Sequence, residues 1–145
     1  MTNQEMVYLI AFFVLIVCAV TDWLSYKIWV PVVLCPAPVM LFLISRSHVS
    51  LWKSILASGI VVASFLLFCF VTKEQIGKGD AILLGIATLG MDLWQIFAFL
   101  FLSFALAGIF GVFIMVVRKK GRKYKIPFAP FLLAGYILTI GLGYL

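Results

Sequence analysis

The sequence has very little charge: only 11% of its 145 residues are charged, whereas 66% are hydrophobic. A soluble domain of this length needs far more polar surface to cover its core. The composition therefore excludes an aqueous globular fold, and lipid is the solvent that we expect. Because a membrane-spanning helix takes about 20 apolar residues, there is room for about six spans and for no separate soluble domain. We therefore treat residues 1–145 as a single transmembrane unit.

The sequence also lacks the patterns of a metal site, a disulfide framework or a secretory signal. Its three cysteines, Cys18, Cys35 and Cys69, lie singly in apolar stretches, which is typical of small buried side chains. The one histidine, His48, has no ligand-type residue near it in the sequence. We therefore expect no metal and no cofactor. No basic segment or cleavage site precedes the first apolar run, so we expect that run to remain as a helix.

The apolar runs lack the alternating pattern of barrel strands, so we predict an all-α, polytopic membrane protein. The fourth run is short: its uninterrupted apolar part, 81–91, would span about 17 Å as a helix, against about 30 Å of hydrocarbon. We expect a short crossing helix that starts below the membrane surface, near Asp80; a re-entrant segment is the alternative. The six expected spans are Met6–Leu24, Ile28–Ile44, Ile55–Val71, Ala81–Leu93, Ile96–Val117 and Pro127–Leu145.

The basic residues predict the orientation of these spans. Nine of the 11 Lys and Arg fall in the first, third and fifth loops, and Arg46 and Lys53 fall in the second. Cytoplasmic loops collect Lys and Arg. We therefore expect the odd loops on the cytoplasmic side of a cell (inner or cytoplasmic) membrane and both termini on the outer side. The basic run 118–125 is most simply a topology determinant, and contact with anionic lipid headgroups is the alternative. We expect no nucleic-acid partner, because no soluble domain presents this run.

Two of the five acidic residues have positions that call for a functional explanation. Asp22 ends the first apolar run, where the helix macrodipole disfavours a carboxylate, although an interfacial Asp paired with Lys27 is the simpler alternative. Asp80 precedes the fourth run, where an ordinary N-cap is the simpler alternative. Gly77 and Gly79 on either side of a lysine let another chain approach closely, which a cap alone does not need.

The charge count assigns both aspartates to the cytoplasmic side. Two carboxyl groups a few ångströms apart share one proton, because both cannot ionise easily. The ionised carboxylate takes a proton from water, and the protonated one polarises a scissile carbonyl. Asp22 and Asp80 are therefore the candidate catalytic pair of an aspartyl peptidase. The sequence offers no other nucleophile and base, because its only histidine falls in a predicted outer loop.

These residues resemble the GxGD intramembrane aspartyl peptidases, and specifically the prepilin peptidases. In that family an Asp at the end of the first core helix is followed by Ile-Pro-Asn, and here Ile28 stands at the matching distance from Asp22. A Glu-x-x-Gly-x-Gly-Asp-x-x-Leu stretch matches 74–83, and an Ile-Pro-Phe-Gly-Pro-Phe-Leu stretch matches 126–132. The resemblance implies cleavage of a prepilin or pseudopilin, with a short basic leader, at the cytoplasmic face. Glu74, Gly77 and Gly79 are implied to shape the loop or bind substrate.

The sequence departs from the family pattern at four positions: Trp29 and Val30 replace Pro-Asn, Ile82 replaces a common Lys, and Ala129 replaces a Gly. It also has no CxxC pair, so we expect a peptidase core without the cysteine-rich domain of many relatives and do not expect methyl transfer. The departures leave open a catalytically silent homologue that binds or assembles pilin-like helices. A small transporter is the third possibility, although its acids should lie near the midplane.

Overall fold

In the computed structural model of the protein, the described residues are 2–25, 30–47, 50–71, 78–118 and 127–143. They contain helices and no strand. Three of these helices are long and apolar enough to span a membrane, which confirms the prediction of an all-α, multi-pass membrane protein. The helices are α1 (Asn3–Ser25), α2 (Val30–Leu34), α3 (Ala37–Ser45), α4 (Leu51–Val71), α5 (Lys78–Thr88), α6 (Leu93–Arg118) and α7 (Ala129–Gly143).

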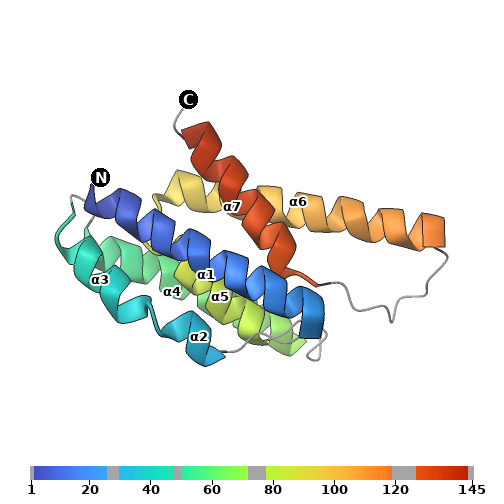
Figure 1. Cartoon of the computed structure of the whole chain (residues 1–145), viewed down its shortest axis with the longest axis horizontal. Coiled ribbons are helices and arrows are strands. Elements are labelled where there is room, and N and C mark those ends of the chain that lie inside the picture. Colours follow the sequence, from blue (N-terminus) through green and yellow to red (C-terminus); the bar gives the residue numbers. More distant parts are fainter. Residues whose placement is uncertain (1, 26–29, 48–49, 72–77, 119–126, 144–145) are drawn as a thin grey trace.

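The helices run up and down the bundle in alternating directions, with α2 and α3 following one another as two pieces of the second pass (Figure 1). At one end of the bundle α1 finishes and both α5 and α7 begin; we call this the aspartate end. The two termini lie toward the opposite end (Figure 1). Because of this alternation, the ends of α1, α4 and α6 and the starts of α2, α5 and α7 lie toward the aspartate end.

The second expected span, Ile28–Ile44, is wrong as a single helix. The structure divides it into α2 and α3, with a turn at residues 35–36. Pro36 and Pro38 have no backbone N–H to donate, and the proline ring crowds the preceding turn, so a regular helix cannot continue through this stretch. The closely spaced prolines are visible in the sequence and could have predicted this break.

Helix α5 is as short as expected, with 11 residues, but it begins at Lys78 rather than Ala81. It packs against α1, α2, α4 and α7, so it lies inside the bundle (Figure 1). Every residue from Asp80 to Met91 is buried except Ile82, which is half-buried. Because protein rather than lipid surrounds α5, the thickness of the bilayer does not set its length.

A close contact with α4 fixes α5 along its axis. A Cβ atom added at Gly85 would collide with the Val62 side chain of α4, so only glycine permits this approach. At the same level the Ser58 hydroxyl donates a hydrogen bond of 2.6 Å to the Gly85 carbonyl. The hydroxyl of Thr88, which is fully buried, lies 3.0 Å from the Leu84 carbonyl. The contacts of Gly85 with Ser58 and Val62 of α4 therefore hold α5 at one position along its axis and in one rotation about it.

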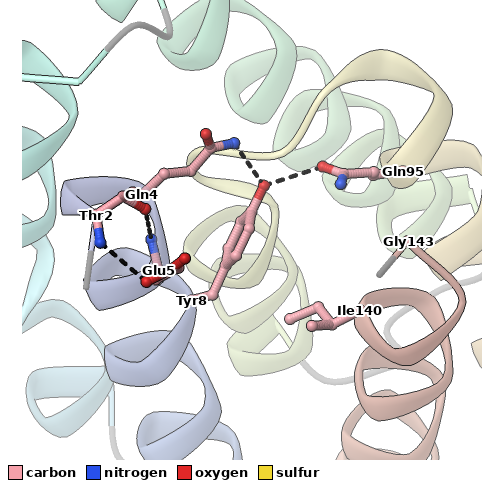
Figure 2. Close-up of a pocket in the computed structure, with 7 residues that line it drawn as sticks. All are labelled: Thr2, Gln4, Glu5, Tyr8, Gln95, Ile140 and Gly143. Carbon is pink, nitrogen blue, oxygen red and sulfur yellow. Dashed lines mark hydrogen bonds between the residues drawn. The ribbon is translucent and has the colours of Figure 1, made fainter. Parts of the chain in front are cut away.

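Beyond the last turn of α5, Gly90 has a φ of +82°, a conformation that glycine adopts without strain. Its N–H donates to the Ser54 hydroxyl at 2.9 Å. The Tyr8 hydroxyl lies 3.1 Å from the Gly90 carbonyl and 3.0 Å from Gln95 Oε1, and Gln4 donates to that hydroxyl at 2.8 Å (Figure 2). Side chains from α1, α4 and α6 thus anchor the end of α5 that lies farthest from Asp80.

Replacement of Gly90 by alanine should lower the stability of the fold by about 1–2 kcal/mol, because a Cβ is strained at positive φ. The added carbon would also press on Val7, at 3.1 Å. The measurement is the free energy of unfolding in detergent micelles. Gly108→Ala is the matched control: a Cβ at Gly108, in α6, would have no atom of the described residues within 4 Å, so this change should not destabilise the protein. Equal stability of the two variants would contradict the prediction.

Glu5 lies in the first turn of α1, which begins three residues before the expected span Met6–Leu24. Its carboxylate accepts a hydrogen bond from the Thr2 N–H at 2.9 Å, and the Glu5 N–H donates to the Thr2 hydroxyl at 3.3 Å (Figure 2). This reciprocal pair is a capping box, for which the Thr-x-x-Glu spacing is the sequence signature. Glu5 therefore has a structural role at the start of α1.

Candidate aspartyl active site

Asp22 lies in the last turn of α1 and is buried, with 7% of its surface exposed, although its neighbours Trp23 and Leu24 are exposed. The C-terminal end of its own helix disfavours a negative charge there. Compensation comes from α7, whose first residue, Ala129, donates its backbone N–H to Asp22 Oδ2 at 3.1 Å. The start of α7 therefore holds the carboxyl group of Asp22 in one orientation.

Three phenylalanines position the start of α7. The ring of Phe128, just before the helix, lies 5.5 Å from Phe104 of α6 and 6.3 Å from Phe65 of α4, measured between ring centroids. The rings of Phe65 and Phe104 stack on one another at 5.8 Å. Pairs of aromatic rings at these distances attract one another beyond the area they bury. The cluster ties α4, α6 and the chain before α7 together, and so sets where the Ala129 N–H points.

Asp80 lies in the first turn of α5, not ahead of the helix as expected, and is 9% exposed. The positive end of the α5 macrodipole stabilises a carboxylate at this position. Gly79, which precedes it in the same turn, is half-buried. Glu74 and Gly77, the other residues predicted to shape this segment, lie outside the described residues. Their predicted roles stay predictions.

The two aspartates come from helices that pack directly on one another, α1 and α5. Cys18, which is buried one turn before Asp22, lies within electrostatic range of both carboxyl groups. Helix α7, whose Ala129 N–H donates to the Asp22 carboxyl group, also contacts α5. The last turn of α1, with Asp22, and the first turn of α5, with Asp80, therefore both lie at the aspartate end of the bundle (Figure 1). That the two carboxyl groups share a proton remains a prediction.

A second polar region, at the end of the bundle near the termini, has no comparable chemistry. It is a hollow of about 220 Å³ lined by residues of α1, α6 and α7 and by Thr2 (Figure 2). Its hydroxyl and amide groups hydrogen-bond to one another, and its one acid, Glu5, belongs to the capping box. Among the described residues, no three His, Cys, Asp or Glu side chains gather as metal ligands. The aspartate pair is therefore the candidate site.

The sequence of the chain matches the family model of the type IV leader peptidases over residues 9–112. The match covers well over half of the 145 residues. The chain belongs to the type IV leader peptidase family. No curated protein and no solved structure matches it significantly.

In this type IV leader peptidase family member, the matched residues include Asp22 and Asp80 and end within α6. Helix α7 lies beyond the match, so the hydrogen bond from Ala129 to Asp22 joins the matched part of the chain to a part outside it. The stretch 126–132 resembles the family pattern in its side chains, and that resemblance assigns no role to its backbone. A main-chain N–H exists at nearly every residue, so no side-chain signal could have identified this donor.

Proposed function

We propose that this family member is an intramembrane aspartyl endopeptidase that removes the leader from prepilin-like or pseudopilin substrates. Asp22 and Asp80 are its proposed catalytic residues. The observation that carries the proposal is the burial of both carboxyl groups at the same end of two helices in direct contact. Family membership supports a peptidase, and these two groups are the described residues best suited to activate water.

In the proposed reaction the ionised carboxylate takes a proton from a water molecule as the water oxygen bonds to the scissile carbonyl carbon. The protonated carboxyl gives its proton to the carbonyl oxygen, which produces a neutral gem-diol. The first carboxyl then passes its new proton to the amide nitrogen while the carbon–nitrogen bond breaks. One gem-diol hydroxyl returns a proton to the second carboxylate, so the pair ends in its starting state. The products are a leader with a new C-terminal carboxylic acid and a mature chain with a free amine.

The proposed location of the reaction is the cytoplasmic face of the cell membrane, with both termini on the other side. Two arguments support it. Basic residues concentrate in the connections at the aspartate end, and cytoplasmic loops collect such residues. Substrates with short basic leaders would also present the scissile bond on that side. The proposed partners are thus the substrate helix and the surrounding lipid, with no cofactor.

The proposal is tested by incubating the chain, reconstituted in lipid vesicles, with a prepilin that carries a basic leader, a glycine before the cut and an apolar helix. We expect a product whose mass places the cut directly after that glycine. Empty vesicles with the same substrate are the control. An uncut substrate that stays bound to the chain would instead support a catalytically silent homologue. Cation flux across the vesicles without cleavage would support a transporter.

A further inference from the structure

An apolar hollow of about 340 Å³ opens on the outer face of the bundle, between α1 and α7. These two helices pack side by side, and α1 forms one wall while α7 forms the other. We call this hollow the α1–α7 groove. Its lining is entirely apolar in residue type and consists of Ile16, Ala19, Val20, Trp23 and Leu24 of α1 with Pro130 and Leu133 of α7.

The α1–α7 groove lies between the same two helices that are joined by the hydrogen bond to the Asp22 carboxyl group. Ala19, at the buried base of the groove, comes three residues before Asp22, and Trp23 directly follows it. On the other wall, Pro130 follows Ala129, whose N–H holds the Asp22 carboxyl. A helix seated in the groove would therefore have one end beside the junction of α1 and α7 at which Asp22 is buried.

We propose that the α1–α7 groove receives the apolar helix of the leader-peptidase substrate, which places the leader junction at Asp22. The inference rests on the proposed function. Before cleavage such a substrate is an apolar helix confined to the bilayer, so it must reach the carboxyl groups sideways from lipid. A lining of predominantly apolar surface suits it, because the helix satisfies its own backbone hydrogen bonds. The small Ala19 side chain at the base lets a second helix approach closely.

The extent of the groove favours a substrate over a permanent partner. Its α1 wall runs from Ile16 to Leu24, which is about 12 Å of helix, or little more than two turns. Stable dimers bury much larger surfaces. The exposed Trp23 at its rim is a side chain that favours the level of the lipid headgroups. The seated segment would then be the first turns of the substrate helix, immediately after the scissile bond.

Val20→Trp tests the proposal by filling the groove, and Val39→Trp on α3 is the matched control. Both valines are 54% exposed, but Val39 does not line the groove. We expect Val20→Trp to raise the KM for the prepilin about tenfold, the cost of roughly 1.4 kcal/mol of binding, with a much smaller change in kcat. Val39→Trp should leave both constants unchanged. Equal KM values for the two variants, with both folded, would overturn the groove assignment.

A photo-cross-linking amino acid at position 20 identifies the occupant of the groove directly. The same chain carries Asp80→Asn, so that the substrate is not cut during the experiment. We expect adducts with the apolar helix of the prepilin, and none from the same probe at position 39. Adducts only with lipid, or only with a second copy of the chain, would overturn the inference. If the unmodified chain leaves the prepilin uncut, the proposed function fails. If the unmodified chain cuts the prepilin normally but the cross-linking chain forms no adduct with it, only the groove assignment fails.

Discussion

Asp22→Asn and Asp80→Asn should each reduce kcat/KM for prepilin cleavage by at least about a thousandfold, the scale seen when a member of a catalytic unit is removed. Asparagine keeps the size of the side chain but can neither take a proton from water nor donate a carboxylic proton. Since the proposed reaction needs one carboxylate and one protonated carboxyl, loss of either group stops it. The measurement is the rate of leader release by each purified variant in lipid vesicles.

The double variant should be hardly slower than either single variant, because residues that act as a unit are strongly non-additive. Asp92→Asn is the control: Asp92 is exposed just before α6, at the other end of the bundle, and its loss should leave the rate unchanged. All variants should unfold at similar denaturant concentrations. Cleavage that survives either single substitution in a folded protein would remove the aspartyl mechanism.

Ala129→Pro should lower kcat about a hundredfold while KM changes much less. Proline has no N–H, so the hydrogen bond to Asp22 is lost, and its ring occupies the space through which that N–H donates. The Asp22 carboxyl must then move, and a shift of about 1 Å in a catalytic group costs about this factor in rate. Proline is well tolerated at the first position of a helix, which is the position of Ala129 in α7.

Ala129→Gly is the matched control, because glycine removes the side chain and keeps the N–H. Its kcat should stay close to that of the unmodified chain. Circular dichroism and the unfolding midpoint of both variants show whether α7 is intact. A proline variant that is folded and fully active would show that the hydrogen bond has no part in positioning Asp22.

Hydropathy was sufficient to predict most of the helices, because in lipid each segment must satisfy its own backbone hydrogen bonds. The expected spans for α1, α4 and α6 differ from the structure by a few residues at their ends. The division between α2 and α3 was missed because a hydropathy run does not register a missing N–H. The early start of α5 was missed because Lys78 and Gly79 are polar or small, although helix geometry accepts both.

For the candidate site, the sequence predicted which acids to consider and at which end of the bundle they would lie. Burial of Asp22 and Asp80 was not predictable in the same way, since it depends on how α1, α5 and α7 pack. The Thr2–Glu5 capping box, in contrast, had a recognisable spacing that could have been read directly. Interactions within one turn of helix leave a pattern in the sequence, whereas a donor contributed by another helix does not.

Because α5 is enclosed by its neighbours, the helix that carries Asp80 has little direct contact with acyl chains. Stretching or thinning of the surrounding membrane acts first on α1, α4 and α6, whose long apolar surfaces meet the lipid. The position of Asp80 is thereby shielded from the lipid composition of the host cell, whereas Asp22, on α1, responds directly to a change in bilayer thickness. A change in growth temperature or fatty-acid content would therefore reach the proposed site through α1 and leave α5 largely as it was.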